Sequence, residues 1–173
     1  EATRGQVALD FLGSREYRQS IVQGGYQEFL GRPADAFGLS AFVSFLDAGA
    51  SFEEFYAQLA ISGEYFAIQG GTNASFVTAI YNDILGRAPD VGGLAHFLGL
   101  LNAGASRAAV VDALFTSEEY ATLLVQGFYS DNLNRDADRG GLDHFVDQLL
   151  TGKYQEVVLA QILGSAEYLS LNA

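Results

Sequence analysis

This chain of 173 residues contains an internal repeat, and the repeat limits what it can fold into. Residues 26–65 match residues 81–120, which lie 55 positions later, and the match needs no gap. Residues 129–168 form a third copy after a further 48 positions. Each copy carries Tyr, Leu-Gly-Arg (Leu-Asn-Arg in the third), Asp, Gly-Leu, Phe and a closing Ser-x-Glu-Tyr, in that order. Repetition at about fifty residues is typical of arrays whose neighbouring units share a core.

The repeat divides the chain into five segments. Residues 1–17 match the end of a unit, residues 18–68 form unit one and residues 69–75 form a Gly-rich linker. Residues 76–120 and 121–173 form units two and three, and the linker accounts for the unequal spacing of the copies. Because the chain opens on Glu1 and contains no Met, we expect it to be a processed or excised piece of a longer protein.

Each unit is predicted to contain about three helices. Apolar residues recur three and four positions apart, as on one face of a helix. Gly31 and Gly86 are placed to end helices in the left-handed conformation, and Ser51 with Glu54 has the form of a capping box. Asp35, Asp90 and Asp138 stand where helix N-caps belong. The predicted fold class is therefore all-α, with tandem repeats packed into a helical array or bundle.

The composition excludes several classes of function. The net charge of −12 opposes binding to nucleic acids and to anionic membrane surfaces. The absence of Cys excludes disulfides, thiolate zinc sites and Cys nucleophiles. No apolar run is long enough for membrane insertion. An acidic, Gly-rich and Cys-free chain with one lysine favours an extracellular or cell-surface location.

The repeated residues resemble a known family. The order Leu-Gly-Arg, Pro with Asp, Gly-Leu, an aromatic residue and Ser-x-Glu-Tyr is similar to the bacterial domain-of-unknown-function family 4214, which is distantly similar to phycobilisome linker domains. The resemblance implies a part of a large secreted or surface protein, beside calcium-binding repeats, S-layer-like regions or enzymes, with no catalytic residue set. The charge of −12 argues against a linker role, which would use basic surfaces. In the third copy Asn134 replaces Gly and Asp136-Ala137 replace the Pro step, which leaves open whether its turn is the same.

The repeated charged residues are interpreted as a structural motif rather than a binding row. Arginine follows the first helix of each unit, where it can meet helix carbonyls or a carboxylate of its own unit. The glutamate of Ser-x-Glu-Tyr is our first choice for the partner. The motif comprises Arg32, Arg87, Arg135, Asp35, Asp90, Asp138, Glu64, Glu119 and Glu167.

A weak calcium candidate lies in the third unit. Asp136, Asp138 and Asp147 occupy the first, third and twelfth positions of a calcium loop, but the fifth is Gly140. The alternative is that Asp138 caps a helix and its neighbours are solvated. His96 and His144 occupy equivalent positions, and a solvent-facing or helix-packing role is the default interpretation for them. A metal site would require the two histidines to meet across units and to recruit further ligands. No cofactor is otherwise expected.

Apolar residues found in only one unit suggest a binding patch, because a core should repeat and a binding surface need not. The candidate patch is Phe37, Phe52, Phe55, Tyr56 and Phe66. The alternative is that these residues contact a unit upstream of the chain.

The leading hypothesis is a non-catalytic interaction or scaffold module of a bacterial secreted or cell-surface protein, serving adhesion, assembly or targeting. Its partner would be a protein or a surface glycan, and self-association is left open. The alternative is a carbohydrate- or matrix-binding accessory domain of a larger extracellular enzyme, stabilised by calcium. An exposed aromatic groove with a polar rim would favour the second. No enzymatic activity is expected, because the repeated serines and carboxylate pairs read as helix caps.

Overall fold

The computed structural model describes residues 3–171, which form twelve α-helices and no strand, so the all-α fold is confirmed. Their bounds are α1 Arg4–Leu12, α2 Arg15–Leu30, α3 Ala36–Asp47, α4 Phe52–Ala60, α5 Gly63–Ile68, α6 Asn73–Leu85, α7 Val91–Asn102, α8 Arg107–Phe115, α9 Glu118–Leu133, α10 Arg139–Leu150, α11 Gln155–Leu163 and α12 Ala166–Leu171.

Local capping residues set where the helices begin and end. Asp35, Asp90 and Asp138 accept hydrogen bonds from the backbone N–H three residues on, at the starts of α3, α7 and α10. Left-handed residues end α2, α6 and α9 at Gly31, Gly86 and Asn134. Asn134 has φ 52° and caps its helix as the two glycines do, so the turn of the third copy keeps the same form.

Unit boundaries fall inside helices. In α2 and α9 the Ser-x-Glu-Tyr segment and the next apolar stripe form one continuous helix of 16 residues. Between units one and two the same stretch is split into α5 and α6. The break is shorter than the predicted linker of residues 69–75, because Thr72 caps α6 and residues 73–75 already belong to that helix.

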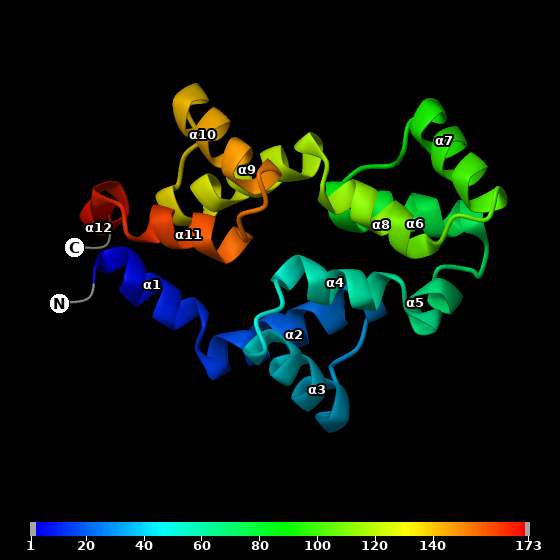
Figure 1. Cartoon of the computed structure of the whole chain (residues 1–173), viewed down its shortest axis with the longest axis horizontal. Helices are drawn as coiled ribbons and strands as arrows, with labels where there is room; N and C mark the ends of the chain where they lie inside the picture. Colours follow the sequence, from blue (N-terminus) through cyan, green and yellow to red (C-terminus); the bar gives the residue numbers. More distant parts are fainter. Residues whose placement is uncertain (1–2, 172–173) are drawn as a thin grey trace.

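The chain contains two equivalent sets of five helices, offset by 103 positions. Helices α1 to α5 and helices α8 to α12 have the same lengths in the same order, namely 9, 16, 12, 9 and 6 residues. We call residues 4–68 the first half and residues 107–171 the second half. Helices α6 and α7 lie between them in the sequence and extend the second half at one end of the molecule (Figure 1).

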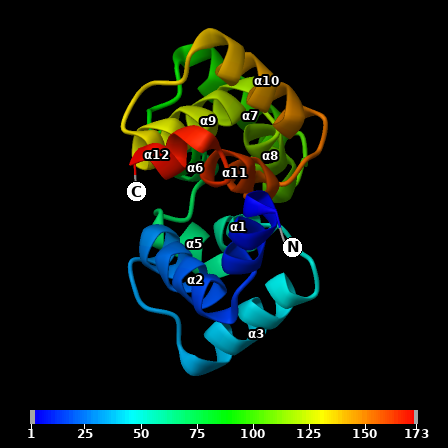
Figure 2. The ribbon, with the colours of Figure 1, turned by 90° about the vertical axis from the view of Figure 1, so that its left-hand side faces the viewer.

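The two halves contact each other reciprocally. Helix α1 of the first half packs on α11 of the second, and α8 of the second packs on α4 of the first. Figure 2 shows α1 beside α11 at the end of the molecule where both termini lie. Because α1 corresponds to α8 and α4 to α11, these two crossings are equivalent contacts made twice.

The core is built from the apolar faces that the repeat predicts. One buried cluster joins the first half to α6, α7 and α8, and a smaller one lies among α9, α10 and α11. The repeated tyrosines Tyr26, Tyr81 and Tyr129 are each 6% exposed. Within residues 3–171, none of the helices combines the length and apolar character that a membrane span requires.

Candidate functional site

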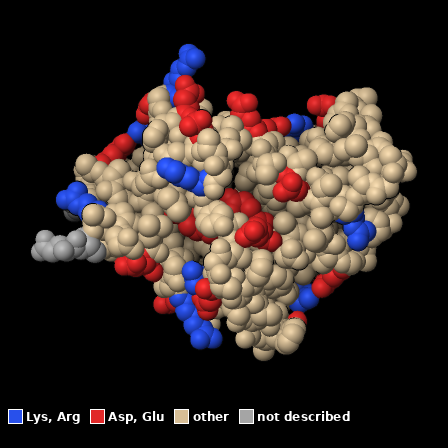
Figure 3. All heavy atoms as spheres, viewed as in Figure 1, with Lys and Arg blue, Asp and Glu red and all other residues tan. Residues whose placement is uncertain are grey.

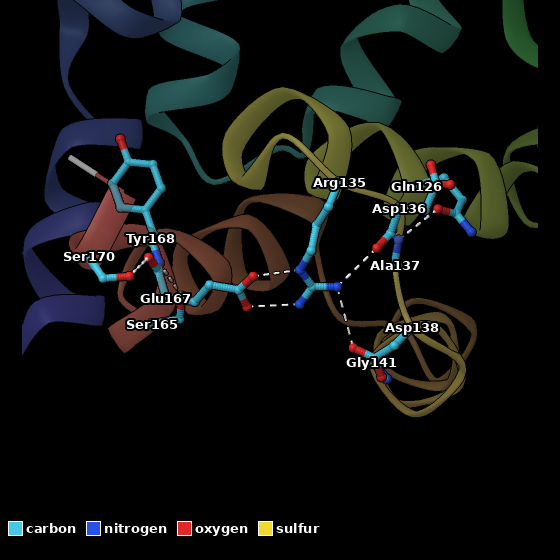
Figure 4. Close-up of polar contacts among 10 residues, drawn as sticks. All are labelled: Gln126, Arg135, Asp136, Ala137, Asp138, Gly141, Ser165, Glu167, Tyr168 and Ser170. Atoms are coloured by element: carbon cyan, nitrogen blue, oxygen red, sulfur yellow. Dashed lines mark hydrogen bonds and ion pairs between the residues drawn. The ribbon is translucent and has the colours of Figure 1, made fainter.

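The repeated arginines and glutamates form one bidentate ion pair per unit. Nε and Nη2 of Arg32 donate to the two carboxylate oxygens of Glu64 at 2.6 and 2.8 Å. Arg87 pairs with Glu119 at 2.5 and 2.7 Å. Arg135 pairs with Glu167 at 2.5 and 2.8 Å, and its Nη1 also donates to the backbone carbonyl of Asp136 (Figure 4). These glutamates are the partners that the sequence suggested.

Each guanidinium also covers the ring of a repeated tyrosine. Its carbon lies 5.2 Å from the ring centroid of Tyr26 in the first unit, 5.3 Å from Tyr81 in the second and 4.8 Å from Tyr129 in the third. Hydrogen bonds from the arginines hold the pKa of Glu64 and of Glu119 below the usual range. The same contact lowers the pKa of Glu167. The repeated charges thus satisfy one another and join the ends of each unit.

The calcium candidates are not brought together. The Asp138 carboxylate accepts from Gly141 N–H, which lowers its pKa, and the nearest cation is Arg135. Asp147 lies nine positions farther along α10, about 13 Å away at 1.5 Å per residue. Across residues 3–171 no group of three or more His, Asp or Glu side chains is arranged to hold a metal ion. The two histidines stay apart: His144 contacts Gln148 on its own helix, and His96 packs on Phe97.

The predicted aromatic patch is wrong. Phe52 and Phe55 are core residues, 5% and 0% exposed. Tyr56 and Phe66 are half-buried, and the guanidinium carbon of Arg107 lies 4.1 Å from the ring centroid of Phe66. Phe37 alone is largely exposed, at 84%. The prediction failed because Phe52, Phe55 and Tyr56 pack on rings of α2 and α3 within the first half, while Phe66 packs on Phe76 and Arg107, so residues that do not repeat still belong to the core.

A groove lies between α4 and α8, at one of the two reciprocal crossings. Its volume is about 720 Å³. Its apolar surface comes mainly from aliphatic side chains and its polar positions include Glu54, Asp112 and Lys153. The groove is lined in part by Ala57, Ile61, Ala108, Ala109, Leu124 and Leu149.

Two positions distinguish the crossing that forms the groove from the α1–α11 crossing. At the α1–α11 crossing a Cβ on Gly164 would lie 2.9 Å from the backbone nitrogen of Gly5, so only glycine permits that approach. The equivalent positions at the other crossing are Ile61 and Ala108, and both line the groove. Their side chains hold α4 and α8 farther apart than α1 and α11.

A second hollow opens beside the groove at the centre of the molecule. It has a volume of about 320 Å³ and shares Phe115, Tyr120 and Leu124 with the groove. Glu28 of α2 and Asp83 of α6 line it. Figure 3 shows acidic side chains gathered in the middle of this face, between the two halves. We call this hollow the central cavity.

Two equivalent carboxyl groups, on Glu53 and Glu156, lie close to each other where α4 and α11 of the two halves meet, and Glu53 also lines the groove. Burial raises the pKa of Glu53 on α4. Burial and the neighbouring Glu53 raise the pKa of Glu156 on α11 to about 7. One Glu156 oxygen, Oε1, accepts from the backbone N–H of Phe52 at 3.2 Å, and Oε2 is buried without a hydrogen bond. Burial and the neighbouring Glu53 therefore oppose ionisation of Glu156 at the contact between the halves.

Comparison with known families decides what kind of domain this is. The family model described as "Domain of unknown function (DUF4214)" matches residues 57–124 and 122–172. The chain belongs to this family. Comparison of the DUF4214 chain with curated proteins and with solved structures finds no match. The first matched segment runs across the unit boundaries, as α9 does, and the second lies within unit three.

Sequence reasoning missed the central cavity and the groove. Glu28 and Asp83 occupy the same repeat column, and Asp131 is the third member, so a repeated acid was visible in the sequence. Which of the three acids face each other depends on the contact between the halves, and that contact has no local signal.

Proposed function

We propose that this DUF4214 chain is a non-catalytic helical interaction or scaffold module of a bacterial secreted or cell-surface protein. Its groove between α4 and α8 receives a segment of a partner protein. The segment carries apolar side chains flanked by basic residues.

The observation that carries the proposal is that repeated residues stabilise the units, whereas residues that do not repeat line the groove. The repeated arginines, glutamates, aspartates and tyrosines hold each unit together, through ion pairs, caps and ring contacts. Positions that differ between the two crossings form the groove. A surface that the repeat does not require is therefore available for binding.

The lining of the groove indicates the chemistry of its occupant. Aliphatic side chains favour apolar partner residues, since burying such surface is favourable by about 25 cal/mol per Å². Glu54 and Asp112 at the groove, together with the net charge of −12, favour a basic partner.

A displayed peptide library tests the proposal although the partner is unidentified. We expect the folded chain to select peptides with apolar residues beside Lys or Arg. Ala109→Trp fills the groove and should weaken their binding about 10-fold or more. Ala95→Trp, on the exposed face of α7, is the matched control and should leave binding unchanged. Selected peptides that bind the Ala109→Trp variant as well as the unchanged chain would show that the groove is not the binding surface.

A further inference from the structure

Helix α1 exposes a face that belongs to the core in every equivalent helix. Helices α1, α4, α8 and α11 each have nine residues and occupy the same place in the repeat. Val7 and Phe11 of α1 are 59% and 60% exposed. The residues at the same two positions of the other three helices are at most 3% exposed, and they are Phe55, Leu59, Val110, Leu114, Val158 and Ile162. Among these four helices, α1 alone leaves both core positions uncovered.

A pair of helices covers this face in the equivalent helices. Helix α4 packs on α2 and α3, and α11 packs on α9 and α10. Helix α8 packs on α6, and its core residues join the same buried cluster as those of α6 and α7. In the first half, the ring centroid of Phe55 lies 4.9 Å from that of Phe42 on α3, and a Cβ on Gly25 of α2 would lie 2.6 Å from the Phe55 ring. The chain itself therefore shows which elements cover this face.

Each pair directly precedes the helix that it covers. Four residues, 48–51, join α3 to α4, and four residues also join α7 to α8 (103–106) and α10 to α11 (151–154). Ser51 and Ser106 end two of these connections and cap the helices that follow. Thr3 caps α1 in the same way. The start of α1 thus has the form of a helix that follows such a pair.

A second copy of this chain has no free pair to offer. Within residues 3–171 the pairs α2–α3, α6–α7 and α9–α10 are already packed on α4, α8 and α11 of the same molecule. Moving one of these pairs to α1 of another molecule would expose the core face of the helix that it leaves. Covering α1 without that cost requires a pair from a further repeat.

We propose that Val7 and Phe11 form a docking surface for two helices of a further DUF4214 repeat, which precede α1 in the same polypeptide. The first of these helices carries the apolar stripe that ends at Leu-Gly-Arg, and the second carries the Asp cap followed by Gly-Leu and Phe. Burial of the two apolar side chains favours docking. The inference goes beyond the proposed function, because α1 contributes no residue to the lining of the groove.

An extended chain tests the proposal. Residues 72–105, which contain α6 and α7, are copied in place of Glu1 and Ala2, so that the copy joins Thr3 at the spacing found before α8. This pair is chosen because α8 carries valine at the position of Val7, as α1 does. Circular dichroism should show added helix. Hydrogen exchange in residues 4–12 should slow about 10-fold or more, because docking suppresses local opening of α1.

Val7→Asp separates docking from mere attachment. In the unchanged chain Val7 is exposed, so the variant should shift the melting temperature by no more than about 2 °C. In the extended chain the same carboxylate would be buried without a partner, so the melting temperature should fall by about 5 °C or more. Val91→Asp in the original α7 is the matched control. That valine is 88% exposed, so its replacement should have the same small effect in both chains.

Three results would overturn the proposal. An equal effect of Val7→Asp in the two chains would show that the copied pair does not cover α1. No added helix, either with this pair or with residues 14–50 copied in its place, would show that the face does not accept repeat helices. A dimer of the unchanged chain that Val7→Asp dissociates in sedimentation would make a second copy the occupant. Peptide selection by the groove is unaffected by these results, so the two proposals can fail separately.

Discussion

Two glycines on α7 lie in very different surroundings, although both are helical. A Cβ at Gly93 would lie 2.6 Å from the hydroxyl oxygen of Tyr81 and 3.3 Å from its Cζ. A Cβ at Gly99 would meet no atom within 4 Å. The first situation recurs in the other units, since Gly38 and Gly141 lie similarly close to Tyr26 and Tyr129. The missing side chain lets the second helix of each unit approach the tyrosine that the arginine covers.

We therefore expect Gly93→Ala and Gly99→Ala to have opposite effects. Gly93→Ala must displace Tyr81 or the helix, which should lower the free energy of unfolding by about 1–3 kcal/mol. Gly99→Ala should raise it by about 0.5–1 kcal/mol, because alanine is the better helix former. Urea unfolding followed by circular dichroism measures both. A gain in stability for Gly93→Ala would show that the tyrosine is not tightly packed.

At the scale of elements, side-chain contacts connect α5 to α6, whereas the corresponding connection in α2 and α9 is a continuous helix. In α2 and α9 one helix fixes the direction of the next unit. Across the break at residues 69–72, Tyr65 is fully buried, packs edge-on against Phe76 and donates its hydroxyl to Asp83. These contacts tie α6 to the first half.

Tyr65→Phe tests that connection. It removes one hydrogen bond to a half-buried carboxylate and should lower the free energy of unfolding by about 1–2 kcal/mol. It should also raise the pKa of Asp83, since the Tyr65 hydroxyl lowers it. Tyr154→Phe, at an exposed position, is the matched control for urea unfolding. If the two variants were equally stable, the hydroxyl of Tyr65 would not hold the junction.

The helix ends could be predicted from the sequence, whereas the site could not. Asp35 and the Ser51–Glu54 capping box act on backbone groups a few residues away, so their chemistry is complete within one segment. Phe55 was predicted to be exposed because it does not repeat, yet it is fully buried. Its neighbours come from other helices, which the local sequence does not indicate. The position of Gln155 in the wall of the central cavity likewise depends on how the two halves pack together.

At the scale of the whole molecule, the halves meet over carboxyl groups that oppose their association at neutral pH. Glu156 has its pKa raised to about 7, and the pKa of Glu53 is raised as well. A raised pKa in the folded state means that folding is favoured while the group is protonated. The stabilisation is complete below about pH 4.5 and is lost as the pH rises through about 7. The lowered pKa values of Glu64, Glu119 and Glu167 act oppositely and destabilise the fold in strong acid.

Glu156→Gln should therefore stabilise the protein most at alkaline pH. The amide oxygen still accepts from Phe52 and the interfacial charge is gone, so the free energy of unfolding at pH 8 should rise by about 1–3 kcal/mol. At pH 5 the gain should be much smaller. Urea unfolding at both pH values, with Glu118→Gln as the exposed control, measures the difference. The same gain at pH 5 and pH 8 would rule out titration of Glu156 as the cause.

The unequal crossings have a consequence for how such a domain can acquire function. In a symmetric homodimer one gene encodes both crossings, so any change that opens one opens the other. Here the two crossings are encoded 103 positions apart, with Gly5 and Gly164 at one and Ile61 and Ala108 at the other. Mutation can therefore reshape the open crossing as a receptor while the closed crossing continues to hold the two halves together.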